Sequence, residues 1–168
     1  MDFDLDKATP RLPSMVAFQI PVSVQNIIIH QCVIDEGAST CIMSKNVWQN
    51  LGAPELKPSI ITLRAYDSHP LTPIGLFKNV PIFFSSKTVH IDIEVLDAHL
   101  EYNIILGKSY MYAMSAITSS IFCIMMFPHE DWIIIVDQLT HTEKRPLNST
   151  DMVLPYVDTT TDGLLRYQ

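Results

Sequence analysis

The nine residues from Cys32 to Thr40 hold the strongest candidate for chemistry in this sequence. An apolar, β-branched run over residues 26–33 predicts a buried strand, and Asp35 follows at its end. An aspartate beside apolar residues is costly unless hydrogen bonds or a partner charge hold it. Gly37 permits the sharp turn that comes next. One interpretation is a carboxylate held for catalysis. The other is an Asx turn in which Asp35 only accepts hydrogen bonds from backbone N–H groups.

Three segments together resemble the retropepsin family of aspartic proteases. They are Val33 to Ser39 around Asp35, Trp48 to Gly52, and Asn103 to Lys108 with its Ile-Leu-Gly sequence. The resemblance covers about residues 15–138. Within the family it is to the protease segment of gypsy-type LTR retrotransposon gag-pol polyproteins, in the plant-like variant with Asp-Glu-Gly-Ala-Ser. It implies an all-β fold, a retropepsin-like closed β-barrel with one or two short helices.

The resemblance also implies a role for each part of the site. Asp35 is the catalytic residue, and the active-site loop consists of Glu36, Gly37, Ala38 and Ser39. Core support is expected beside the catalytic strand, where glycine permits close packing, from Ile105, Leu106 and Gly107. A hairpin over residues 60–77 matches the flap that closes over bound peptide. Its turn supplies the candidate substrate contacts Tyr66, Asp67, Ser68 and His69. An ordinary surface hairpin is the alternative.

Position 36 departs from the family pattern, which has Ser or Thr there. In the family that hydroxyl joins a hydrogen-bond network that links two active-site loops across a dimer. An ionised Glu36 only accepts hydrogen bonds and adds negative charge beside Asp35. This departure favours a second hypothesis, a catalytically silent retropepsin-fold module for dimerisation or peptide binding.

The count of motifs predicts a homodimer. Aspartic peptidases use two carboxylates about 3 Å apart that share one proton, because like charges so close cannot both ionise. This chain contains one Asp-x-Gly-Ala, and the lookalikes at Asp158 and Asp162 lack a preceding apolar strand. Catalysis therefore requires one Asp35 from each of two subunits. The first hypothesis is thus an aspartic endopeptidase that cuts extended peptide segments of a polyprotein. A third, an unrelated small β-rich binding domain, applies if Asp35 lies away from any dimer axis.

Composition and charge exclude several classes of partner for this protein. The chain has 168 residues, of which 48% are hydrophobic and 17% charged, as in one globular domain. A net charge of −7 argues against direct nucleic acid binding. The sequence has no apolar run of membrane-spanning length and no secretory signal, so we expect a cytoplasmic protein without membrane association. The three cysteines lack the spacing of metal ligands. His129, Glu130 and Asp131 are of metal-binding types, but three adjacent residues in a turn rarely converge on one ion. No metal or other cofactor is expected.

The pattern of apolar residues and breakers predicts the element order. A flexible N-terminal lead-in is expected over 1–14, the protease domain over 15–138 and a polar C-terminal linker over 139–168. Strands are expected at 16–24, 26–33, 60–66, 71–77, 80–84, 88–96, 103–107, 120–127 and 132–136, and short helices at 44–52 and 108–114.

Several residues carry more specific expectations. Ser44 fits an N-cap, Gly52 fits a C-cap, and Trp48 is expected as a core anchor rather than a substrate contact. Pro21 predicts a bend or an edge position in the first strand. The alternation in 88–96 places the carboxylates of Asp92 and Glu94 on a solvated face. The apolar run 121–127 is expected to require burial, and the resemblance implies a terminal strand that interleaves with its copy in a partner chain.

Overall fold

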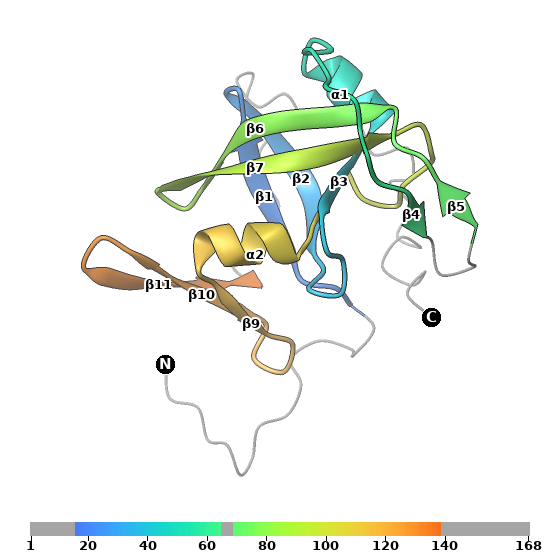
Figure 1. Cartoon of the computed structure of the whole chain (residues 1–168). Coiled ribbons are helices and arrows are strands. Elements are labelled where there is room, and N and C mark those ends of the chain that lie inside the picture. Colours follow the sequence, from blue (N-terminus) through green and yellow to red (C-terminus); the bar gives the residue numbers. More distant parts are fainter. Residues whose placement is uncertain (1–15, 65–68, 139–168) are drawn as a thin grey trace.

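The computed structural model describes residues 16–64 and 69–138. It contains a closed β-barrel with a smaller sheet beside it (Figure 1). The barrel has the strand order β1-β2-β8-β3-β7-β6, the smaller sheet the order β11-β10-β9, and β4 pairs with β5. The strands are β1 (Gln19–Val24), β2 (Ile27–Ile34), β3 (Cys41–Ser44), β4 (Leu63–Arg64), β5 (Pro70–Leu71), β6 (Gly75–Phe84), β7 (Lys87–Leu96), β8 (Ile104–Leu106), β9 (Ile117–Ser119), β10 (Ile124–His129) and β11 (Trp132–Asp137). The helices are α1 (Lys45–Asn50) and α2 (Lys108–Met114). The predicted all-β class, with a closed barrel and short helices, is confirmed. The expected lead-in and linker lie outside the described residues.

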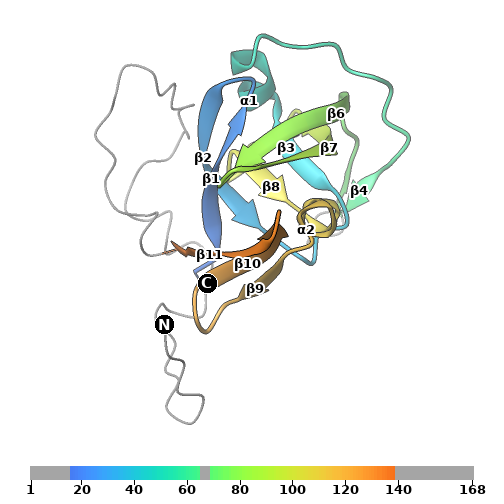
Figure 2. The same cartoon turned by 90° about the vertical axis from the view of Figure 1, so that its left-hand side faces the viewer.

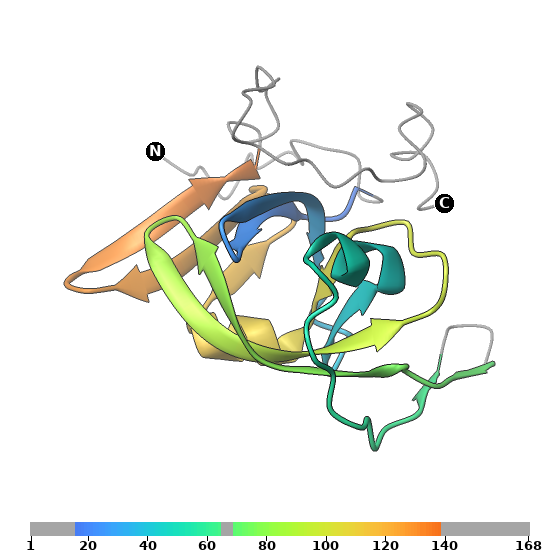
Figure 3. The same cartoon turned by 90° about the horizontal axis from the view of Figure 1, so that it is seen from above.

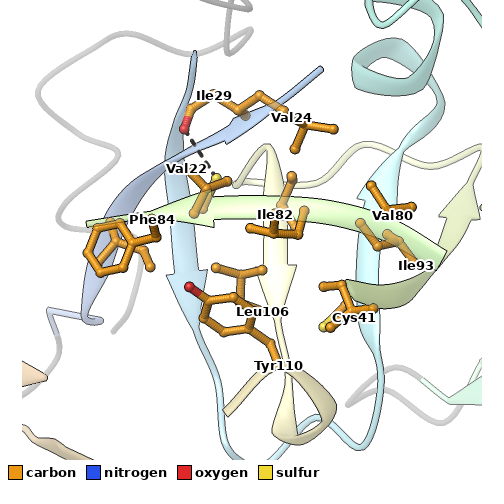
Figure 4. Packing of buried hydrophobic residues seen from close by; sticks show 14 of the residues in the cluster. Val22, Val24, Ile29, Cys41, Val80, Ile82, Phe84, Ile93, Leu106 and Tyr110 are labelled. Carbon is orange, nitrogen blue, oxygen red and sulfur yellow. Dashed lines mark hydrogen bonds between the residues drawn. The ribbon is translucent and has the colours of Figure 1, made fainter. Parts of the chain in front are cut away.

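The barrel interior is filled by aliphatic side chains that alternate inward along the strands. Val22, Ile82 and Leu106 come from three different strands and are at most 2% exposed (Figure 4). Helix α2, which follows the short strand β8, adds Tyr110 to this core, and that side chain is fully buried. Removing such side chains from water is the main favourable term for folding.

Local signals in the sequence explain where the strands reverse and bend. Ser85 and Ser86 have φ of 43° and 74°, the left-handed conformations that a two-residue turn needs to join β6 to β7. The register between β1 and β2 shifts between Ile20 and Val22, so the bend expected at Pro21 is present. At helix α1, the Ser44 hydroxyl accepts a hydrogen bond from the Val47 N–H at 3.3 Å, and Gly52 follows with φ of 90°.

The hairpin expected over 60–77 is much shorter in the structure. Only Leu63–Arg64 and Pro70–Leu71 pair, while residues 60–62 form no strand and residues 65–68 lie outside the described residues. Proline has no N–H to donate, so Pro70 and Pro73 limit pairing beyond this point. Gly75 already begins β6, which belongs to the barrel.

Glu94 corrects the prediction of a solvated face on β7. Its side chain is buried, with 5% of the residue exposed, whereas Asp92 two residues earlier is exposed. Glu94 pairs with Leu76 of β6 on one side and with Ile42 of β3 on the other. Alternation along a strand predicts which residues face inward, but it does not show which part of the outer face neighbouring elements cover.

The first half of the predicted strand 120–127 is a turn, and only its second half is a strand. Strand β9 ends at Ser119, Cys123 has φ of 53°, and β10 begins at Ile124. Strand β10 then pairs with both β9 and β11. This three-stranded sheet lies beside the barrel and α2 (Figure 2), and the β4–β5 hairpin lies on the opposite side of the barrel (Figure 3).

The described part of the chain contains no group of three His, Cys, Asp or Glu side chains placed to hold a metal ion. Among its helices, none is long and apolar enough to cross a membrane.

Lys87 joins the barrel to the smaller sheet. Its ammonium donates hydrogen bonds to the carbonyl of Met114 at the end of α2, at 2.6 Å, and to that of Pro128 in β10, at 2.8 Å. The same nitrogen lies 5.7 Å from the centre of the Phe127 ring. Two carbonyl groups and an aromatic face thus meet one cation, which fixes the sheet against the β6–β7 hairpin.

We expect Lys87→Met to lower the free energy of unfolding by about 1–2 kcal/mol, because both carbonyls lose a charged donor. Denaturant unfolding followed by circular dichroism measures the change. The matched control is Lys78→Met, at an exposed position on β6. Equal stability of the two variants would show that Lys87 does not hold the sheet.

Candidate active site

Asp35 lies directly after β2, where the strand leaves the barrel wall. Strand β2 runs parallel to β8, with Val33 opposite Ile105 and Ile34 opposite Leu106. The Asp35 N–H continues this ladder by donating to the Leu106 carbonyl at 3.0 Å. Asp35 itself is exposed. The apolar run therefore delivers a carboxylate to the surface from a backbone that is held in place up to the same residue.

The loop after Asp35 is a tight turn built on hydrogen bonds to that aspartate. Its carboxylate Oδ1 accepts from the Gly37 N–H at 2.9 Å, and its carbonyl accepts from the Ala38 N–H at 3.1 Å. The Asx turn that was one interpretation of the motif is thus present. It orients the carboxylate through one oxygen, and within the described residues the other oxygen, Oδ2, has no protein donor. The structural role and a catalytic one are therefore compatible.

The rest of the predicted active-site loop is at the surface. Glu36, Gly37 and Ser39 are exposed, and Ala38 is half-buried. In Figure 1 the light-blue connection from β2 to β3 lies at the lower edge of the barrel, between the three-stranded sheet and the β4–β5 hairpin. An exposed carboxylate with an oriented oxygen can accept a proton from water or from a bound group.

Gly107 supports this loop from below. A side chain at position 107 would lie 2.6 Å from the carbonyl oxygen of Ala38 and would also contact that of Thr40. The next residue donates its N–H to the Ala38 carbonyl, from Lys108 at 2.7 Å. The end of β8 thus lies directly against the loop, which is possible only without a Cβ atom.

The other two expected support residues lie on opposite faces of β8. Leu106 is fully buried in the barrel core. Ile105 is half-buried and lies outside that core, in register with Val33 and with Ile42 of β3. Its position thus differs from the core position expected for it, because the short strand alternates between the two faces.

Cys41 is a support residue that the sequence did not indicate. Its sulfur accepts a hydrogen bond from the Gly107 N–H at 3.3 Å and lies 3.3 Å from the Ser109 hydroxyl. Burial raises the pKa of the Cys41 thiol, and the contacts with Ser109 and Gly107 lower it by less. The thiol therefore stays protonated and serves packing. A cysteine inside a β-branched run gives no signal of such a contact.

The predicted substrate contacts are only partly described. Tyr66, Asp67 and Ser68 lie outside the described residues, and His69 is exposed directly before β5. Trp48 is half-buried against the barrel core and donates from its ring nitrogen to the Pro54 carbonyl at 2.9 Å, as expected for an anchor.

We expect Gly107→Ala to lower the free energy of unfolding by about 1–3 kcal/mol, because the added methyl group meets backbone carbonyls that cannot move aside cheaply. The matched change is Gly37→Ala, where the new Cβ would lie 3.1 Å from Asp35 Oδ1, the end of a side chain. That variant should unfold close to the wild type. Thermal unfolding of both measures the difference, and equal loss in the two variants would contradict the packing argument.

No protein-family model and no curated protein matches the sequence. Solved structures do match. The retroviral protease-like domain of Ddi1 from Leishmania major is 12% identical with a TM-score of 0.57, over 73% of this chain and 96% of that one. The EIAV protease in complex with the inhibitor HBY-793 is 14% identical with a TM-score of 0.52, over 71% of this chain and 99% of that one. A retropepsin-like aspartic protease from Rickettsia conorii is 23% identical with a TM-score of 0.47, over 62% and 82%. The first two show the fold, and the chain therefore has the retropepsin-like fold of aspartic proteases.

Proposed function

We propose that this protein is a homodimeric aspartic endopeptidase that uses one Asp35 from each subunit. The observation that carries the proposal is the exposed Asp35 carboxylate at the end of a buried strand in a retropepsin-like barrel, oriented by the Gly37 N–H. An ordinary surface aspartate requires neither a hydrogen-bonded loop of this kind nor a glycine packed beneath it.

The chemistry requires a second carboxylate close to the first. In the dimer the two carboxylates share one proton, and a water molecule lies between them. The ionised carboxylate takes a proton from that water as its oxygen attacks the scissile carbonyl carbon, while the protonated one donates to the carbonyl oxygen. The tetrahedral intermediate then breaks its C–N bond as the amide nitrogen takes up the proton held by the first carboxylate, and a hydroxyl group of the intermediate returns a proton to the second. All atoms come from the peptide and one water, so no cofactor is needed.

The outer face of the three-stranded sheet supports a contact with a second copy. Ile117, Met126 and Ile135 lie side by side across β9, β10 and β11. Ile117 is 60% exposed, Ile135 54% and its neighbour Ile133 63%. An apolar patch of this kind marks an interaction surface. We assign it to the partner subunit because a single chain supplies only half of the catalytic pair.

The substrate we propose is an extended peptide, such as a segment of a retroelement polyprotein. The β4–β5 hairpin is the candidate flap, and it lies across the loop of Asp35 from the three-stranded sheet (Figure 1). A strand-like peptide between hairpin and barrel gains main-chain hydrogen bonds. Buried and unpaired Cys32, Cys41 and Cys123 suit the reducing cytoplasm.

We expect Asp35→Asn to lower the rate of peptide cleavage by about 1000-fold or more, since an amide cannot take up the proton of water. Cleavage of a peptide library at acidic pH is the measurement, and Asp92→Asn, an exposed acid on β7, is the control. Subunits that exchange freely give a sharper test. An equal mixture of wild type and Asp35→Asn should retain about a quarter of the activity of the same total amount of wild type.

Equal cleavage by wild type and Asp35→Asn would remove Asp35 from the mechanism. A wild type that cleaves nothing, with activity restored by Glu36→Ser, would instead identify the chain as a silent module for dimerisation or peptide binding.

We expect Ile135→Asp to raise the dimer dissociation constant by about 100-fold, because the symmetric contact buries the new charge twice. Sedimentation velocity over a concentration series measures this. The control is Phe83→Asp, which changes a residue 49% exposed on β6, outside the three-stranded sheet. A dimer weakened equally by both changes, or by neither, would exclude this face as the contact.

A further inference from the structure

Five residues form a continuous row across the outside of the barrel wall. Cross-strand partners define the row: Val33 lies opposite Ile105, Ile105 opposite Ile42, Ile42 opposite Glu94, and Glu94 opposite Leu76. These residues come from β2, β8, β3, β7 and β6. We call them the outer row.

The outer row belongs to the same side of the wall as the catalytic aspartate. Val33 precedes Asp35 by two residues, and the ladder between β2 and β8 continues to the Asp35 N–H, so both side chains alternate to one face. Ile105, Ile42 and Leu76 are half-buried and do not pack against the barrel core. They present apolar surface beside the carboxylate that would cleave a peptide.

Glu94 is the charged member of this apolar row. It is 5% exposed, and its Oε2 is fully buried with no hydrogen-bond partner among residues 16–64 and 69–138. Asp92, the acid two residues before it, is exposed, and its Oδ1 accepts the Asn79 N–H at 2.7 Å. The two acids on one face of β7 therefore differ, because in the part of the chain that the structure describes Asp92 has a donor and the Oε2 of Glu94 has none.

The nearest cationic side chain along the outer row, Lys57, already forms an ion pair with Glu55. Lys57 pairs with Leu76 through both backbone hydrogen bonds, which extends the row by one position. Its ammonium lies 2.5 Å from Glu55 Oε1 in an exposed ion pair. Glu94 therefore has no counter-ion within the described residues.

We propose that Glu94 is a specificity-determining residue that selects a Lys or Arg side chain in the peptide substrate. The inference rests on the proposed peptidase function. A buried acceptor without a donor is costly, and a ligand that brings a charged donor removes that cost. A basic side chain does so with its apolar stem on Leu76 and Ile42 and its cation at the carboxylate. The chain's net charge of −7 also favours basic peptides.

Strand spacing gives the place in the substrate. Glu94 lies three strands from Val33, which is about 14 Å at the usual separation of neighbouring strands. An extended peptide advances about 3.3 Å per residue. The selected basic residue should therefore lie within about four residues of the scissile bond.

The test compares paired peptide substrates that have Lys or Met at each of these positions in turn. We expect the wild type to favour Lys over Met at one position by about 10-fold or more in kcat/KM, and Glu94→Gln to remove this preference while it still cleaves the Met peptide. Asp92→Asn, the matched neutralisation on the same face, should keep the preference. Glu94→Gln should also unfold at the same temperature as the wild type or higher, since a buried charge is gone.

Two results would overturn the inference. One is a wild type that cleaves Lys and Met peptides equally at every position. The other is a Glu94→Gln variant that keeps the preference and loses stability together with Lys57→Met, as a structural ion pair would require.

Binding separates this inference from the proposed function. In the Asp35→Asn background, calorimetry with the Lys and Met peptides measures affinity without cleavage. Preferential binding of the Lys peptide that Glu94→Gln removes would support the role of Glu94 even in a protein that cleaves nothing, and binding without preference would exclude it.

Discussion

The contact between the end of β8 and the loop of Asp35 is the constraint on which the site depends. Gly107 lies so close to the carbonyls of Ala38 and Thr40 that no side chain fits between them. The backbone on both sides of that glycine is hydrogen-bonded to the loop: the Asp35 N–H donates to the Leu106 carbonyl, and the Lys108 N–H donates to the Ala38 carbonyl. The carboxylate is held by two strands that are far apart in the sequence and adjacent in the barrel.

Much of this arrangement could be predicted from the sequence. The run before Asp35, the Ile-Leu-Gly segment and the capped helix at Ser44 are local signals with direct physical causes, and each lies where it was expected. The close packing at Gly107 followed from the family resemblance rather than from the residues. The same resemblance predicted the closed barrel, which no single segment determines.

Other features depend on contacts between distant segments and gave no local signal. Glu94 lies in an alternating pattern that is the same for a solvated and a covered outer face. Its neighbours on the two sides are Ile42 of β3 and Leu76 of β6, which the pattern within β7 does not reveal. The hydrogen bond from Gly107 to Cys41 is likewise invisible, because cysteine is common in buried strands. The β4–β5 pair is short because Pro70 and Pro73 limit pairing. These prolines are local signals, but the β-branched run before them favours the longer hairpin that was predicted.

Helix α2 links the two halves of the proposed enzyme. It begins at the glycine beneath the catalytic loop and ends at Met114, which Lys87 ties to the three-stranded sheet. The seven residues of α2 thus connect the floor of the proposed active site to the end of the helix that Lys87 ties to the three-stranded sheet. In the proposed enzyme this helix gives a change in the subunit contact a direct structural route to the loop of Asp35, so we expect association and turnover to be coupled.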